Sequence, residues 1–223
     1  MRIIGNDGKE KQIEGIIFDL DGTLLDSMKI WDTIGNDYIE SLGITAEENL
    51  AVTFKDMSME QSAEYYRSVY GVDKSSEEII SEINEMIAVF YKEKAELKEG
   101  VNDFLEACRL QGIPMCIATA TSKVLVEAAL KRLNILHFFK KVLTCGEVGK
   151  GKDSREIFDQ ALKCLGTDMG RTPVFEDALH AARTAKNAGF YVIGVFDPSE
   201  PYQNEMKQTS DIYVNRINDL KIK

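Results

Sequence analysis

The stretch Ile-Ile-Phe-Asp-Leu-Asp-Gly-Thr at residues 16–23 decides the fold of this chain. Its apolar part belongs to a short run, Ile13–Phe18, with the length and composition of a buried β-strand. Asp19 and Asp21 follow directly, and Gly22 lets the backbone turn sharply behind them. Polar residues directly behind a buried strand mark the edge at which a parallel sheet binds ligands.

Four more runs of the same kind occur further along the chain. They are Ile113–Ala118, Lys141–Thr144, Pro173–Phe175 and Tyr191–Phe196. Between them, within residues 100–196, apolar residues recur at helical spacing, and Gly112, Gly166 and Gly189 stand where helices should end. Strands and helices therefore alternate, which predicts the α/β class with a doubly wound parallel sheet.

Residues 27–96 interrupt this alternation, because they contain no strand-like run and their apolar residues form helical stripes. The stripes are Ile30, Ile34, Tyr38 and Leu42; Met59, Ala63, Tyr66 and Tyr70; and Ile79, Ile83, Met86 and Phe90. The sequence thus predicts a core domain of residues 1–26 and 97–223 with an inserted all-helical domain of residues 27–96. The tripeptide Asn6-Asp7-Gly8 predicts the turn of a small hairpin.

Composition excludes several classes of protein. The 223 residues include 27 Lys and Arg against 37 Asp and Glu, and no basic patch alternates with aromatic residues, so nucleic acids and anionic membranes are poor partners. No apolar run approaches the ~20 residues that cross a bilayer, and no signal-peptide pattern is present, so we expect a cytoplasmic protein. The four cysteines form no CxxC pair, which favours buried thiols over disulfides or zinc ligands.

Polar residues that bear chemistry follow the predicted strands. They are Asp19 and Asp21 after the first strand, Thr119 after the second, Lys152 after the third, and Glu176 and Asp177 after the fourth. Because the carboxyl ends of parallel strands share one edge, we expect these side chains to form one site. Clustered carboxylates repel one another unless a cation is present, and hard oxygen ligands suit Mg²⁺. The candidate metal ligands are Asp19, Asp21, Glu176 and Asp177.

An aspartate beside a divalent cation and a lysine can attack phosphorus and form an acyl phosphate. We assign the attack on phosphorus to Asp19, and Lys152 would hold both Asp19 and the phosphate. Asp21 would act as the general acid and then as the general base. Thr119 completes the candidate catalytic set by donating to a phosphoryl oxygen. The candidate phosphate-binding residues are Gly22, Thr23, Thr119, Ala120 and Lys152. Lys55, in a break between insert helices, is a candidate for gripping a second polar part of the substrate, although a solvated loop lysine is the simpler interpretation.

Two other residues also have simpler interpretations. Asp177 is a good N-cap for a helix that starts at Ala178, a role compatible with metal binding. Thr119 can serve as a satisfied hydroxyl at the end of a strand.

Four segments resemble, in order and spacing, the signature motifs of the haloacid dehalogenase (HAD) superfamily. The segments are FDLDGT (18–23), IATATS (117–122), GKGKDSREIF (149–158) and FEDALHAARTAKNAG (175–189). The branch that the chain resembles most is the β-phosphoglucomutase-like phosphatases, whose helical cap is inserted just after the first motif.

That resemblance implies a Mg²⁺-dependent phosphatase, a monomer or homodimer, that hydrolyses a small phosphorylated metabolite, by default a sugar phosphate. It implies that Asp19 is the phospho-accepting nucleophile and that Asp21 is the acid and base, with a main-chain carbonyl that also binds Mg²⁺. It likewise implies that Thr119 and Lys152 bind phosphate and that Asp177 is the second carboxylate ligand. Dehalogenases and phosphonatases lack an aspartate at position 21, which argues against those reactions.

The sequence also departs from the family pattern and leaves alternatives open. Asp-Ser-Arg follows Lys152 where the family usually has Pro-x-Pro, so Lys150 is a second candidate for the lysine. A phosphosugar mutase shares the same motifs, although Thr23 stands where mutases often carry valine. A receiver-like module is another class, but in that fold the acidic pair precedes the phospho-accepting aspartate and no helical insert follows the first strand. A non-catalytic binding protein is a third class, and the intact Asp19, Asp21 and Asp177 argue against it.

Overall fold

The chain forms two compact units, an α/β unit of Met1–Ser27 with Ala95–Lys223 and a helical unit of Met28–Lys94. The computed structural model describes residues 1–46, 49–54 and 57–223. Within those residues, no helix combines the length and the apolar composition needed to cross a membrane.

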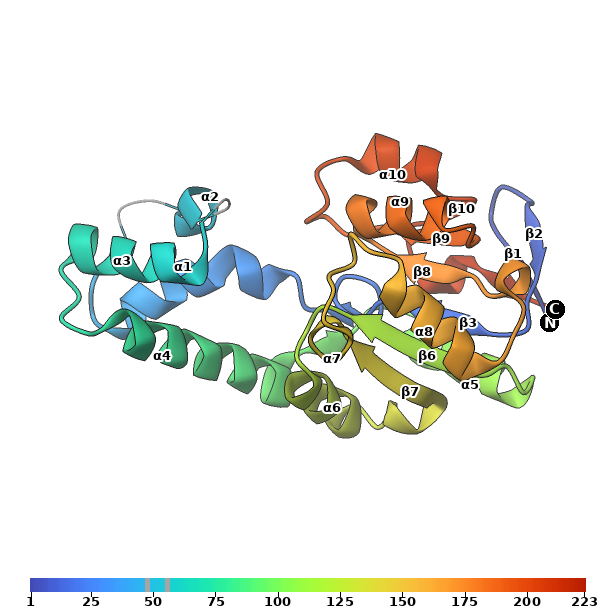
Figure 1. Ribbon diagram of the computed structural model, residues 1–223, viewed down its shortest axis with the longest axis horizontal. Helices are drawn as coiled ribbons and strands as arrows, with labels where there is room; N and C mark the ends of the chain where they lie inside the picture. The colour runs from blue at the N-terminus through green and yellow to red at the C-terminus, as the bar shows by residue number, and fades with distance from the viewer. Residues whose placement is uncertain (47–48, 55–56) are drawn as a thin grey trace. The chain divides into compact units, whose positions relative to one another are not determined.

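A six-stranded sheet forms the centre of the α/β unit (Figure 1). In spatial order its strands are β10 (Ile212–Val214), β9 (Val192–Val195), β8 (Val174–Glu176), β3 (Ile16–Phe18), β6 (Met115–Thr119) and β7 (Phe139–Thr144). All neighbouring strands are parallel. In register, Phe18 of β3 pairs with Ile117 of β6 and Phe175 of β8, so the carboxyl ends of these three strands lie side by side.

Helices cover both faces of this sheet because its strands are apolar on both sides. The α/β unit's helices are α5 (Val101–Leu110), α6 (Lys123–Arg132), α7 (Cys145–Val148), α8 (Glu156–Leu165), α9 (Leu179–Asn187) and α10 (Gln203–Thr209). Ile17 of β3 belongs to a core shared with α8, α9 and α10, whereas its neighbour Phe18 packs edge-on against Phe104 of α5. The sheet is therefore doubly wound.

Short elements complete the α/β unit. Strands β1 (Arg2–Ile4), β2 (Glu10–Gln12) and β11 (Lys221–Ile222) form an antiparallel sheet, and β4 (Leu25–Asp26) pairs antiparallel with β5 (Glu96–Leu97). Single helical turns occur at Leu136–Phe138, Met169–Arg171 and Ile217–Asp219.

The helical unit contains α1 (Lys29–Ser41), α2 (Leu50–Phe54), α3 (Met59–Tyr70) and α4 (Ser76–Val89), which continues as a π-helical turn at Phe90–Lys94. Ser58 and Ser75 start α3 and α4 with capping boxes, in which each serine hydroxyl accepts the backbone N–H three residues on. The predicted apolar stripes lie on α1 with its C-cap Leu42, on α3, and on the run from α4 into the π-helical turn. In each stripe two or three residues are buried, and they are Ile30, Ile34 and Tyr38; Ala63 and Tyr66; and Ile79 and Ile83.

The predicted fold class is confirmed, and so is the hairpin at the N-terminus, formed by β1 and β2. Several strand boundaries differ from the prediction. Strand β3 begins at Ile16 rather than Ile13, because the Ile13 N–H donates to the Met1 carbonyl outside the main sheet. Strand β7 begins two residues before Lys141, at Phe139, and strand β10 was not predicted at all.

Candidate active site

The carboxyl edge of β8, β3 and β6 brings the predicted polar residues together. Asp19 follows β3 directly, Thr119 is the last residue of β6, and Glu176 ends β8 with Asp177 next to it. All four residues are buried. The parallel pairing of the three strands therefore places these four residues along one edge of the sheet.

Lys152 reaches the same edge from the loop between α7 and α8. Its Nζ donates to Oδ1 of Asp19 and, at 2.5 Å, to Oε1 of Glu176. Lys150, two residues earlier, is exposed. The lysine that contacts Asp19 is thus Lys152.

Three carboxylates form an acidic cluster around this contact. Each of Asp19, Glu176 and Asp177 offers an oxygen, and these atoms all lie within 4.8 Å of one another. Burial raises the pKa of Glu176 to about 7, with Lys152 opposing the shift and Asp19 adding to it. Burial also raises the pKa of Asp177 well above its usual range, and the charges of Asp19 and Glu176 add to this effect.

One ammonium does not neutralise this cluster. Burial alone would lower the pKa of Lys152, but the carboxylates of Asp19 and Glu176 more than offset it and raise the pKa instead. Lys152 therefore stays charged, as a single positive charge beside three acidic groups.

The acidic cluster fits a divalent cation. Oε2 of Glu176 is buried and has no hydrogen-bond partner among the described residues, which is costly for an ionised carboxylate. The cluster offers hard oxygen atoms from three side chains, the donor type that Mg²⁺ prefers. A cation here would offset both the burial of these carboxylates and their mutual repulsion, which together raise the carboxyl pKa values.

Asp21 lies beside the cluster but its side chain points to other partners. Its carboxylate accepts hydrogen bonds from the hydroxyls of Ser27 at 2.6 Å and Thr121 at 2.7 Å. The Thr23 hydroxyl donates to Oδ1 of Asp177 at 3.1 Å, which links the loop after β3 to β8. Ser27 and Thr121 were not identified from the sequence as partners of Asp21, although Thr121 belongs to the motif at residues 117–122 and Ser27 follows the first motif closely.

Gly22 turns the chain in this loop with a positive φ of 78°, which glycine adopts without strain. Its carbonyl accepts a hydrogen bond from Nζ of Lys98 at 2.5 Å. Lys98 also donates to the Phe196 carbonyl at 2.7 Å and pairs with the buried Asp197 at 2.9 Å. Lys98 could not be identified from the sequence, because it lies outside every motif and only the fold brings its partners near it.

The remaining candidate residues differ in their placement. The Thr119 hydroxyl accepts the Thr121 N–H at 3.1 Å, and Ala120 is exposed between them. Lys55 lies outside the described residues.

The interpretation of Asp177 as a helix cap is wrong. Ala178 is the N-cap of α9 and has no capping side chain, whereas Glu200 accepts the Leu179 N–H at 2.8 Å. Glu200 lies 21 residues after Leu179 along the chain, so no local pattern in the sequence predicted this contact.

Comparisons with known proteins agree with this arrangement. A model of the haloacid dehalogenase-like hydrolases matches residues 16–195. The chain is 26% identical over 192 residues to the phosphorylated carbohydrates phosphatase of Thermotoga maritima, covering 79% of this chain and 82% of that protein. It is 24% identical over 208 residues to the bifunctional riboflavin kinase/FMN phosphatase of Arabidopsis thaliana, covering 93% of this chain but only 54% of that longer enzyme.

The fold recurs in solved structures. A crystal structure of a β-phosphoglucomutase-like protein from Thermotoga maritima has a TM-score of 0.81 to this chain at 23% identity, covering 91% of this chain and 94% of the other. This likeness shows that the two chains share their architecture.

Proposed function

The chain belongs to the haloacid dehalogenase-like hydrolases, and on that premise we propose that it is a Mg²⁺-dependent phosphatase that acts through a phosphoaspartate at Asp19. One observation carries the proposal: the ammonium of Lys152 contacts Asp19 inside a cluster of three buried carboxylates. A structural ion pair would not require two further acidic groups at the same point.

The first step transfers the phosphoryl group to Asp19. A carboxylate oxygen of Asp19 attacks phosphorus while the ester P–O bond breaks, and the electron pair leaves with the ester oxygen. Asp21, protonated, donates its proton to that oxygen. Lys152 holds Asp19 in place and offsets the negative charge of the phosphoryl oxygens.

The second step hydrolyses the phosphoaspartate. Asp21, now ionised, takes a proton from water as the water oxygen attacks phosphorus. The bond between phosphorus and Asp19 breaks, which releases phosphate and restores both side chains. Thr119, Gly22, Thr23 and Ala120 are the proposed phosphate-binding positions around this reaction, and Lys55 stays a candidate for the rest of the substrate.

Asp19, Glu176 and Asp177 would hold the metal through their carboxylates, with the main-chain carbonyl of Asp21 as a fourth ligand. When bound, Mg²⁺ neutralises charge that develops on the phosphoryl oxygens.

We propose that the substrate is a small phosphomonoester. Relatives that dephosphorylate carbohydrates make sugar phosphates the first class to test.

We also assign the helical unit the role of a cap, which excludes water while the phosphoaspartate forms.

The test is phosphate release from a panel of sugar, polyol and aryl phosphates with Mg²⁺ in excess. Asp19→Asn keeps the size of the side chain, and we expect it to lower the rate by at least ~10³-fold. Asp159→Asn is the matched control, because Asp159 forms an exposed ion pair on α8, and it should leave the rate unchanged. Full activity of Asp19→Asn would show that the nucleophile is elsewhere.

The same assay separates hydrolysis from phosphoryl transfer within a sugar. A phosphatase releases phosphate from hexose 1-phosphate, whereas a mutase returns the group to another hydroxyl and yields hexose 6-phosphate. Chromatography of the sugar products distinguishes the two. A phosphorylated Asp19 that persists without turnover would instead support a receiver-like module.

A further inference from the structure

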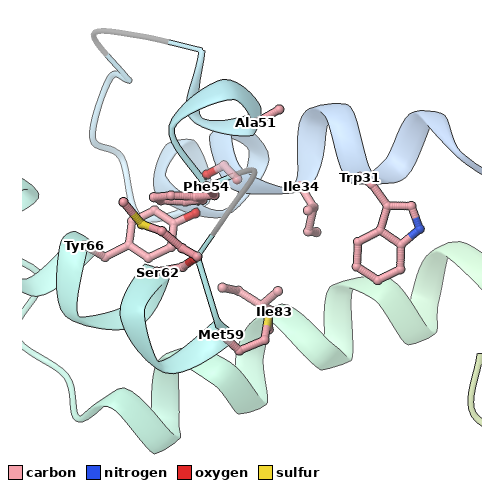
Figure 2. A pocket seen from close by; sticks show the side chains of 10 residues that line it. Trp31, Ile34, Ala51, Phe54, Met59, Ser62, Tyr66 and Ile83 are labelled. Carbon is pink, nitrogen blue, oxygen red and sulfur yellow. Dashed lines mark hydrogen bonds between the residues drawn. The ribbon is translucent and has the colours of Figure 1, made fainter. Parts of the chain in front are cut away.

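The helical unit contains a cavity of about 310 Å³ that the proposed chemistry does not use. Ten residues from α1, α2, α3, α4 and the segment just before α3 line it, all within the helical unit (Figure 2). This volume falls within the ~300–1,000 Å³ of small-molecule pockets. The cavity is therefore large enough for a small ligand.

One end of the cavity is aromatic and held in place by its neighbours. Figure 2 shows the rings of Phe54 and Tyr66 together at this end, with Trp31 at the other. The Phe54 ring meets Tyr66 edge-on at 5.0 Å between centroids and Tyr65 at 5.5 Å. The Tyr66 hydroxyl donates to the Gly35 carbonyl at 2.7 Å, so its polar atom is already bonded. This end is a preformed carbon surface.

Gly35 makes that surface possible. A Cβ at position 35 would lie 3.1 Å from Cβ of Leu50 and 3.3 Å from Cδ2 of Phe54, so any larger residue would crowd these two side chains of α2. Glycine inside a helix costs helix stability relative to alanine. Gly35 nevertheless stands inside α1, where its lack of a side chain lets Phe54 pack against α1 and line the cavity.

The other lining side chains leave apolar surface uncovered. Trp31 is 44% exposed and Met57 is 36% exposed, and covering such surface would release free energy. None of the described lining residues is charged, and Ser62 contributes one hydroxyl. Met57 and Met59 are unbranched and adapt to irregular shapes. The lining suits an apolar ligand better than a sugar ring with a hydroxyl on every carbon.

We propose that this cavity binds a small apolar group, one aromatic ring or a branched aliphatic group with at most one polar substituent. The group has two possible sources, the apolar part of a phosphorylated substrate or a separate molecule. Only the first source rests on the function proposed above.

Binding is measured through Trp31, the one tryptophan among the 223 residues. Benzyl alcohol absorbs too little at 295 nm to interfere, so titration of the full chain with it should change Trp31 fluorescence saturably, whereas glycerol should not. Ala51→Leu places extra carbon atoms in the cavity and should weaken binding at least about tenfold. Val52→Leu, at the neighbouring position of α2, is the matched control, because Val52 is 71% exposed and does not line the cavity.

Circular dichroism checks that each variant is folded. If Ala51→Leu is not, Met59→Gln tests the same point by making the lining polar. A linear, non-saturable response to benzyl alcohol, or equal affinity in the folded cavity variants and the wild type, would overturn the proposal.

A kinetic comparison then identifies the source of the apolar group. If it belongs to the substrate, Ala51→Leu should lower kcat/KM for benzyl phosphate about tenfold relative to glycerol phosphate. If binding of benzyl alcohol is lost in Ala51→Leu while both kcat/KM values persist, the ligand is a separate molecule. Absence of turnover with both esters and with every sugar phosphate of the panel above would contradict the phosphatase proposal and leave the fluorescence result standing.

Discussion

Replacing Lys152 by methionine tests the charge balance of the acidic cluster. Methionine keeps most of the length of the side chain and removes only the ammonium. Asp19 and Glu176 would then lose the donor that they share, and three buried carboxylates would remain without a positive charge between them. The variant therefore isolates the contribution of one buried positive charge to the stability of the acidic cluster.

The magnitude follows from burial. Lys152 is buried together with both of its partners, and removal of one partner from such a group costs about 3–5 kcal/mol. For a chain of this size that corresponds to a fall in Tm of roughly 6–20 °C. The loss should be larger at pH 8 than at pH 5.5, because at the lower pH Glu176, whose pKa is about 7, is protonated and needs no cation.

Thermal melting followed by circular dichroism, with EDTA present, measures this effect at both pH values. Lys150→Met is the control, since Lys150 is exposed and two residues away, and it should shift Tm by less than about 1 °C. Mg²⁺ should restore part of the stability lost in Lys152→Met, and phosphatase activity should fall at least ~10²-fold. An unchanged Tm at pH 8, or an equal fall in Lys150→Met, would refute the assigned role of Lys152.

Two further predictions concern the surroundings of the acidic cluster. The folded-state pKa of Glu176 is about 7, above its ordinary value of 4.5. Protonation of Glu176 therefore stabilises the metal-free folded protein fully below pH 4.5, and this stabilisation is lost as the pH rises through 7. Mg²⁺ should therefore raise Tm more at pH 8 than at pH 5.5, and an equal increment at both would contradict this. Lys98→Met leaves the buried Asp197 without its cation and the Gly22 carbonyl without its donor, which should cost about 2–4 kcal/mol in urea unfolding. Adding Asp197→Asn should recover part of that loss, and a double variant with fully additive losses would argue against the ion pair.

The sequence was sufficient to predict the arrangement of the strand-end residues. Asp19, Thr119 and Glu176 each stand at the end of an apolar run, and parallel pairing converts that position in the chain into proximity in space. Lys152 was identified because its loop follows β7 at the same edge. These residues depend on topology, which hydrophobic periodicity specifies well.

Other contacts could not be predicted, because they depend on side-chain geometry between distant segments. Lys98 and Asp197 are 99 residues apart, and no local pattern distinguishes them from solvated surface residues. Strand β10 was missed because Ile212, Tyr213 and Val214 form too short a run to be told from a loop, and its place beside β9 becomes apparent only in the sheet.

The antiparallel pairing of β4 with β5 has a consequence for how this architecture changes over evolution. Leu25 faces Leu97 and Asp26 faces Glu96, so the chain leaves the α/β unit and re-enters it on adjacent strands, ~5 Å apart. The helical segment therefore connects β4 to β5 in the way that a turn connects the two strands of a hairpin. Segments of other lengths and compositions can be exchanged there without moving a strand of the main sheet, which allows ligand preference to diversify while the reaction chemistry is inherited unchanged.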